Sequence, residues 1–128
     1  MKLLITGGAG FIGSAVVREA LMSQEHTVIN LDCLTYAGNL DSVSNYRDNQ
    51  NYSFEKVDIC NRIDLQRVLK DHKPNAIMHL AAESHVDRSI DDPAEFINTN
   101  IFGTFTLLEA TREYFENLND NQKKQFRF

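Results

Sequence analysis

Apolar blocks alternate with amphipathic blocks along the chain, and this pattern predicts strands that alternate with helices. Four short apolar or alternating segments predict strands at residues 2–6, 26–32, 52–58 and 76–82. Three longer segments with helical spacing predict helices at residues 11–22, 61–73 and 93–118, and a short helix is expected near residues 40–46 within a polar loop. Residues 119–125 form a polar tail, and residues 126–128 resemble the opening of a fifth strand.

Apolar positions indicate the inner face of each helix. In the first helix they are Ile12, Ala15, Val16, Ala20 and Leu21. The second helix follows Asn61, a residue type favoured at the cap, and its predicted inner face is Ile63, Leu65, Val68 and Leu69. The third helix carries Phe96, Ile97, Ile101, Phe105, Leu108 and Tyr114.

The alternation of strands and helices implies right-handed crossovers, so the predicted class is α/β with a doubly wound parallel sheet. We expect the strand order 3-2-1-4, with a ligand at the carboxyl ends beside the first strand. At 128 residues the chain is long enough for one domain with its own core. This sheet is expected to stop at the start of its fifth strand.

Composition and charge narrow the class of protein. The chain is 42% hydrophobic and 24% charged, as in soluble globular proteins, and no apolar run approaches membrane-spanning length. Its net charge of -5 argues against nucleic acid or an anionic membrane as the main partner. Cys33 and Cys60 match no metal or redox spacing, so both are interpreted as reduced thiols of a cytoplasmic protein.

Three glycines follow the first strand and lead into the first helix. They are Gly7, Gly10 and Gly13. In such motifs one glycine makes the tight turn, another lets the backbone approach a phosphate, and Gly13 would let the helix pack closely on the strand. The helix N-terminus offers free N–H groups to the anion. The motif therefore predicts a dinucleotide site.

Asp32 ends the second predicted strand, about 20 residues after the glycines. A carboxylate at this position accepts hydrogen bonds from both ribose hydroxyls of a dinucleotide. It favours NAD over NADP, because it repels a 2′-phosphate. The alternative is that Asp32 is a helix cap or a solvated loop acid.

Later strand ends supply further candidates. Asp58 and Ile59 follow the third strand and are interpreted as adenine contacts, although a strand-end Asp is also common in turns. Small Ala81 and Ala82 would let a cofactor lie close to the backbone, with Ser84 toward the nicotinamide.

Other polar residues have weaker claims. Thr99 and Asn100 on the long helix are candidates for hydrogen bonds to the neighbouring loop or the cofactor, with simple packing as the alternative. His79 is interpreted as a core histidine. His85 and Asp87 have no further ligands nearby in the sequence, so no metal site is predicted.

The chain resembles the extended short-chain dehydrogenase/reductases, which have the Rossmann fold, and in particular the bacterial dTDP-glucose 4,6-dehydratases. Four segments carry the resemblance, at residues 5–14, 34–40, 78–89 and 99–104. Many relatives share the glycine motif, whereas residues 34–39 (LTYAGN) and 81–89 (AAESHVDRS) are much more specific to nucleotide-sugar dehydratases. Cys33 stands where the family usually has lysine, a change expected to alter affinity modestly. The resemblance covers essentially the whole chain but only the N-terminal portion of the family.

The resemblance also implies a set of NAD contacts. They come from Phe11, Ile12, Asp32, Cys33, Leu34, Thr35, Asp58, Ile59, Leu80, Ala81, Ala82, Glu83, Ser84 and Thr99. Ser84 is further implied to touch the sugar nucleotide.

The family's reaction moves hydride from C4 of the sugar to NAD, eliminates water across C5–C6 and returns hydride to C6. By this resemblance the catalytic Thr, the Tyr-x-x-x-Lys pair and the Asp-Glu pair would all lie beyond Phe128, as would the substrate domain. The complete enzyme is expected to be a homodimer acting on dTDP-glucose, and the isolated chain to be inactive.

Tyr52 and Lys56 formally match the family's Tyr-x-x-x-Lys pair. Four residues advance about 6 Å in a helix, but about 13 Å in a strand. Because this segment is predicted to be a strand, we interpret the match as accidental.

Two alternatives stay open. In the first, the chain is a non-catalytic nucleotide-binding module or a part completed in trans by another chain. In the second, it belongs to a related UDP-sugar epimerase or decarboxylase. Independently, an unpaired sheet edge beside the fourth strand predicts that the isolated chain self-associates.

Overall fold

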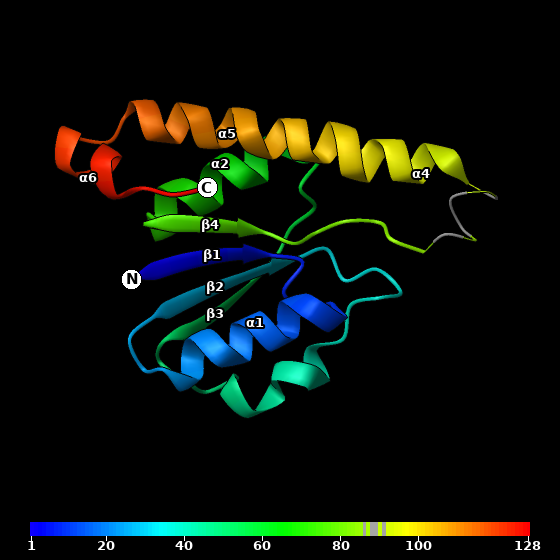
Figure 1. The fold of residues 1–128 in the computed structure, drawn as a ribbon, viewed down its shortest axis with the longest axis horizontal. Helices are drawn as coiled ribbons and strands as arrows, with labels where there is room; N and C mark the ends of the chain where they lie inside the picture. The colour runs from blue at the N-terminus through cyan, green and yellow to red at the C-terminus, as the bar shows by residue number, and fades with distance from the viewer. Residues whose placement is uncertain (86, 88–89, 91) are drawn as a thin grey trace.

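The chain forms a four-stranded parallel sheet with helices on both faces (Figure 1). The computed structural model describes residues 1–85, 87, 90 and 92–128. The strands are β1 (Lys2–Thr6), β2 (Thr27–Asp32), β3 (Tyr52–Lys56) and β4 (Ala76–His79). Their order is β3-β2-β1-β4, and every pairing is parallel. The predicted α/β class and strand order are confirmed.

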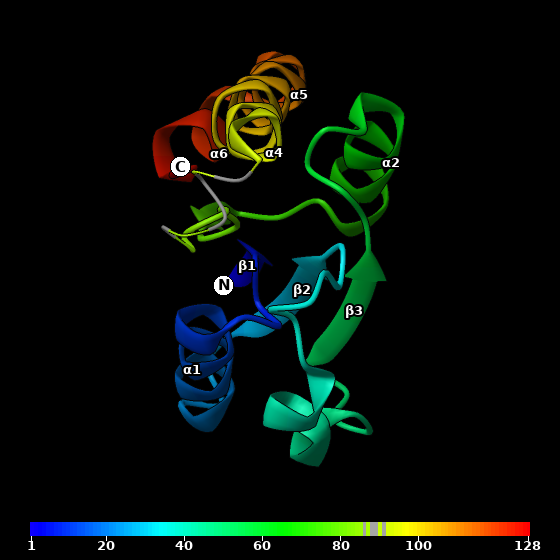
Figure 2. The ribbon, with the colours of Figure 1, turned by 90° about the vertical axis from the view of Figure 1, so that its right-hand side faces the viewer.

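Helices cover the two faces unequally. They are α1 (Phe11–Met22), the 3-10 helix η1 (Leu40–Tyr46), α2 (Arg62–His72), α4 (Pro93–Ile97), the π-helix η2 (Asn98–Gly103), α5 (Thr104–Glu116) and α6 (Asp120–Gln125). Both views place α1 and η1 on one face, and α2 with the α4–α5 rod on the other (Figures 1 and 2).

The core has two layers because β1 is buried on both sides. Leu4 belongs to the cluster that packs against α2 and α5, whereas Leu3 and Ile5 belong to the cluster against α1 and η1. This alternation explains why the segment is apolar at every position from Leu3 to Ile5.

The predicted inner face of α1 is partly wrong. Leu21 is buried as predicted, but Ile12 and Ala15 are exposed. Gly13 and Val17, which were not among the predicted positions, are buried with Leu21. These three positions are four residues apart and therefore share one face of the helix. The contact of Gly13 with the preceding turn selects that face.

One inner-face residue of α2 is also wrong. Leu65, Val68 and Leu69 are buried as predicted, but the Ile63 side chain is 78% exposed. A helical rotation of about 100° per residue puts Ile63 on the side away from Leu65 and Val68.

The third predicted helix is a composite. α4, η2 and α5 follow one another without a break, and the π-helical turn lies in the middle. Gly103 ends that turn, and a Cβ there would lie 2.8 Å from the Ile59 side chain, so the rod approaches the end of the third strand closely. Its buried face includes Leu107 and Ala110, whereas several of the predicted apolar residues are exposed, namely Ile97, Ile101, Phe105 and Leu108.

The C-terminal part differs from the predicted polar tail in one respect. Residues 120–125 form α6, which begins with a capping box between Asn119 and Gln122. Arg127 then pairs with Ala76 through a single parallel bridge, on the side of β4 away from β1. This bridge confirms that residues 126–128 begin to extend the sheet.

Two predicted strands are too long. β3 ends at Lys56 rather than residue 58, and β4 ends at His79 rather than residue 82. The extra residues leave the sheet at its carboxyl edge, where they line a pocket. Within the described ranges, no helix is long and apolar enough to cross a membrane.

Candidate functional site

The glycine turn joins β1 to α1 at the carboxyl edge of the sheet, the edge that faces the viewer in Figure 2. Gly7 has φ of +70°, and a Cβ on it would lie 2.6 Å from the Ala81 nitrogen. A Cβ on Gly13 would lie 2.0 Å from the Gly7 carbonyl oxygen. Gly10 is the least crowded, with 3.2 Å to that same oxygen. The crowding fits two of the predicted roles, the tight turn at Gly7 and the close packing at Gly13.

The N-terminus of α1 is open toward this edge. Gly10 is the N-cap and makes no side-chain cap. Helix geometry leaves the N–H groups of Phe11, Ile12 and Gly13 without a partner inside the helix, and none of the hydrogen bonds among the described residues uses them. Phe11 is 94% exposed. These N–H groups and the helix dipole make a site for an anion such as a pyrophosphate.

Asp32 ends β2 beside the turn and is only 8% exposed. Its Oδ2 accepts the Ala9 N–H at 3.0 Å, and its Oδ1 accepts the Leu34 N–H at 2.8 Å. Each carboxylate oxygen can accept a further hydrogen bond, so the ribose role remains chemically open. Leu34 has φ of 58°, an uncommon left-handed conformation for a leucine, which turns the chain sharply after Asp32.

The two thiols near this edge are poor nucleophiles. Partial burial, followed by the charges of Asp32 and Asp58, raises the pKa of Cys33, although the residue keeps exposed surface. Burial and the Asp58 carboxylate raise the pKa of Cys60 to about 11. The Cys60 Sγ donates to the Asn98 carbonyl at 3.5 Å. Both thiols are therefore protonated at neutral pH, consistent with a passive role.

Glu83 joins three elements around the pocket. Tyr36, in the loop after β2, donates its hydroxyl hydrogen to Glu83 Oε2 at 2.9 Å. Asn100, in the π-helix η2, accepts the Glu83 N–H at 2.8 Å and donates to the Glu83 carbonyl at 2.9 Å. The prediction that Asn100 bonds the neighbouring loop is confirmed. The bond from Tyr36 was not foreseen.

A pocket of about 110 Å³ lies among these loops. The predicted residues that line it are Gly7, Gly10, Asp32, Cys33, Thr35, Asp58, Ile59, Leu80, Ala81, Ala82, Glu83 and Thr99. Small-molecule pockets are typically larger, at roughly 300 Å³ or more. The fold brings together residues from four different strand ends.

Five predicted residues do not line this pocket. They are Phe11, Ile12, Gly13, Leu34 and Ser84. The first three form the first turn of α1 beside it, Leu34 shapes the loop after β2, and Ser84 is exposed just after Glu83. Val86, Arg88 and Ser89 of the resembling segment lie outside the described residues.

The pocket also contains residues that the sequence reasoning missed. They are Leu31, Ala37, Gly38, Val57 and Glu95. Ala37 and Gly38 lie in the segment 34–40 already singled out, so the motif itself carried the signal. Leu31 and Val57 adjoin predicted strand-end contacts. Glu95 reaches the pocket from α4, and no local pattern indicated this.

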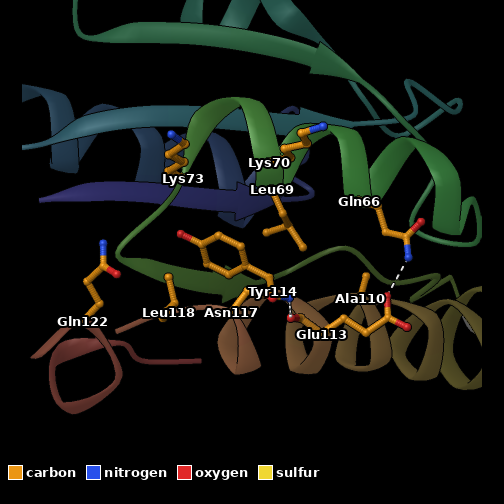
Figure 3. Close-up of a pocket in the computed structure, with 10 residues that line it drawn as sticks. All are labelled: Gln66, Leu69, Lys70, Lys73, Ala110, Glu113, Tyr114, Asn117, Leu118 and Gln122. Atoms are coloured by element: carbon orange, nitrogen blue, oxygen red, sulfur yellow. Dashed lines mark hydrogen bonds between the residues drawn. The ribbon is translucent and has the colours of Figure 1, made fainter. Parts of the chain in front are cut away.

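A larger cavity of about 570 Å³ lies between α2, α5 and α6 (Figure 3). Several of its polar groups bond one another or the backbone, since Gln66 donates to Glu113 at 2.6 Å and the Tyr114 hydroxyl donates to the Pro74 carbonyl at 3.0 Å. Pro74 precedes β4, so the cavity lies at the amino end of that strand. Parallel α/β sheets bind ligands at the carboxyl ends, and we therefore assign the candidate site to the smaller pocket.

The remaining polar candidates are structural in this fold. Tyr52 and Lys56 begin and end β3, and the Tyr52 hydroxyl accepts a hydrogen bond from Asn30 at 3.0 Å. They are thus spread along a strand, as predicted. His79 bonds two threonine hydroxyls, as expected for a core histidine with its polar atoms satisfied. No group of three His, Cys, Asp or Glu within the described part could hold a metal ion.

Comparison with known proteins gives consistent matches. The family model described as GDP-mannose 4,6 dehydratase matches residues 4–128. A dTDP-glucose 4,6-dehydratase of Shigella flexneri is 58% identical over 128 residues, which are 100% of this chain and 36% of that protein.

Solved structures agree. DesIV, a dTDP-glucose 4,6-dehydratase of Streptomyces venezuelae with NAD and TYD bound, is 44% identical with a TM-score of 0.83, over 89% of this chain and 36% of that one. The UDP-glucose 4-epimerase of Thermus thermophilus in complex with NAD is 34% identical with a TM-score of 0.78. That match covers 89% of this chain and 34% of the epimerase chain. The chain thus spans about a third of the length of the relatives it matches.

Proposed function

The chain belongs to the GDP-mannose 4,6 dehydratase family, and on that premise we propose that it is the NAD-binding part of a dTDP-glucose 4,6-dehydratase. The observation that carries the proposal is the glycine turn beside Asp32. Free N–H groups of α1 face the pyrophosphate position, and the Asp32 carboxylate faces the ribose position. The NAD complexes of the dehydratase and epimerase relatives support this choice of cofactor.

The substrate proposed for the complete enzyme is dTDP-glucose, converted to dTDP-4-keto-6-deoxyglucose and water in the cytoplasm. Support comes from the 58% identity with a dehydratase of that specificity, compared with 34% for the epimerase. Ser84, exposed next to the pocket residue Glu83, is the residue proposed to touch the sugar nucleotide.

In this proposal the chain's own residues bind and orient NAD but do not catalyse. NAD, when bound, supplies the hydride acceptor. The turn holds the pyrophosphate, Asp32 holds the adenosine ribose, and Asp58 with Ile59 contacts the adenine. Leu80 to Ala82 form a flat wall against which the rest of the cofactor extends.

Calorimetric titration of the chain with NAD and NADP tests the binding step. We expect saturable NAD binding and at least tenfold weaker NADP binding, because the Asp32 carboxylate repels a 2′-phosphate. Asp32→Asn should narrow the difference between the two cofactors. Equal affinity for both cofactors, or no binding of NAD, would contradict the proposal.

A chimera tests the enzyme assignment. Residues 1–128 are joined to the remaining two thirds of the Shigella flexneri relative and supplied with dTDP-glucose. We expect 4-keto product from the chimera and none from the isolated chain. Product from the isolated chain would refute the division of roles. A folded chimera that binds NAD but forms no product would favour a non-catalytic nucleotide-binding module.

A further inference from the structure

His79 connects two strands and the long helical rod through its ring nitrogens. It lies at the end of β4, in register with Thr6 of β1. Its Nδ1 is 2.7 Å from the Thr6 hydroxyl oxygen, and its Nε2 is 3.0 Å from the hydroxyl oxygen of Thr104, the first residue of α5. The Thr6–His79–Thr104 chain thus links β1 and β4 to α5 beside the glycine turn.

The Thr6 hydroxyl determines which ring nitrogen carries the proton. Its oxygen accepts the Ala81 N–H at 3.2 Å and the Leu80 N–H at 3.1 Å, the latter shared with the Thr6 carbonyl. A hydroxyl has two acceptor sites and one hydrogen. With both acceptor sites used, its hydrogen points to His79 Nδ1. That nitrogen is therefore unprotonated, and Nε2 carries the ring hydrogen and donates to Thr104.

The same hydroxyl fixes the wall of the candidate site. Leu80 and Ala81 both line the pocket, and Ala81 lies so close to Gly7 that no side chain fits between them. We propose that His79, held as the Nε2–H tautomer, is a positioning residue that orients the Thr6 hydroxyl and thereby holds the Leu80–Ala81 wall against the glycine turn. The consequence for NAD affinity rests on the proposed function, whereas the tautomer does not.

A doubly protonated ring does not fit this arrangement. An Nδ1–H would be a third donor directed at a Thr6 oxygen with two acceptor sites. Burial alone lowers the pKa of His79, and no charged side chain of the described residues adds to that shift. Geometry and desolvation thus both favour the neutral ring of His79.

Two substitutions separate the two ring nitrogens. The amide of asparagine lies as far along the side chain as Nδ1, so His79→Asn retains an acceptor for the Thr6 hydroxyl. The amide of glutamine reaches as far as Nε2, so His79→Gln retains only the bond to Thr104. A purely structural role predicts similar losses of NAD affinity for both variants, since each replaces the ring with a smaller side chain.

The test combines nitrogen NMR with NAD titration. Long-range proton–nitrogen correlations of the His79 ring at pH 7 should show the Nε2–H tautomer. His79→Gln should weaken NAD binding about tenfold and His79→Asn by no more than about threefold, reflecting loss or retention of the bond that orients Thr6. Thr6→Ser should retain affinity, and Thr6→Val should lose it.

The outcomes separate this inference from the proposed function. An Nδ1–H tautomer, a protonated ring at pH 7, or equal losses for the asparagine and glutamine variants would overturn the positioning role. If the wild-type chain binds no NAD but shows the Nε2–H tautomer, the proposed function fails while the hydrogen-bond assignment stands. If NAD binds but the ring carries its hydrogen on Nδ1, the positioning role fails while the proposed function stands.

Discussion

Gly13 is the position in the turn with the least room for a side chain. A Cβ there would lie 2.0 Å from the Gly7 carbonyl oxygen. The backbone fixes the position of the Cβ, and the oxygen is itself a backbone atom, so neither can rotate away. We predict that Gly13→Ala lowers the free energy of unfolding by about 2 kcal/mol or more. Gly10→Ala is the matched control, because its Cβ would meet the same oxygen at 3.2 Å, and its expected loss is below about 1 kcal/mol. Urea unfolding of both variants measures the difference, and equal losses would contradict the steric argument.

At this scale, the sequence was most informative where backbone geometry demands a residue type. The glycines could be predicted because few other residues suit a crowded turn. Asp32 could be placed beside that turn because it ends the next strand of the sheet. Glu95 could not be predicted, because it reaches the pocket from α4 across a long sequence separation. The bond between Tyr36 and Glu83 was hidden for the same reason, since 47 residues separate them.

The link between β3 and α2 depends on one carboxylate. Glu55 accepts hydrogen bonds from Arg67 at 2.7 Å and contacts His72 Nε2 at 2.7 Å. The Arg67 guanidinium, more than His72, lowers the pKa of Glu55. A carboxyl group with a lowered folded-state pKa stabilises the fold above its unfolded pKa, and this contribution is lost as the pH falls through the folded value.

We therefore predict that Glu55→Gln lowers the free energy of unfolding by about 1 kcal/mol at pH 7, as for a partly buried ion pair. The loss should shrink as the pH falls below the ordinary glutamate pKa of about 4.3 and through the lowered folded-state pKa of Glu55, where the wild-type carboxyl becomes protonated. Glu113→Gln serves as the control, because Glu113 bonds Arg62 and Gln66 at a more exposed position. Denaturant titrations across this pH range test the prediction, and a variant whose deficit grows at acid pH would contradict it.

Strand order and the places of the main helices could be predicted at the scale of elements, because short buried strands and amphipathic helices leave a clear pattern. Helix rotation could not always be predicted. In α1, the close contact at Gly13 places Val17 and Leu21 inward, overriding the apparent stripe through Ile12. α6 was missed although Asn119 and Gln122 form a recognisable capping box, so that signal was available and not used.

Two surfaces of the whole molecule are open to association with a second copy. Beyond the bridge at Arg127, the described residues leave the outer side of β4 without a neighbouring strand. On the α4–α5 rod, Ile97, Ile101 and Phe105 are exposed at spacings of four residues and so form one apolar stripe. Open strand edges and contiguous apolar patches both promote association.

We predict that the isolated chain self-associates with rising concentration. Phe105→Glu introduces a charge into the stripe and should lower the weight-average mass measured by light scattering. Met22→Glu is the matched control, because Met22 is an equally exposed apolar residue on α1, across the sheet. If neither variant changes the mass, association through the β4 edge alone accounts for it. A wild-type chain that stays monomeric at high concentration would show that neither surface recruits a second copy, and that water and the chain's own α6–Arg127 segment suffice to protect the edge.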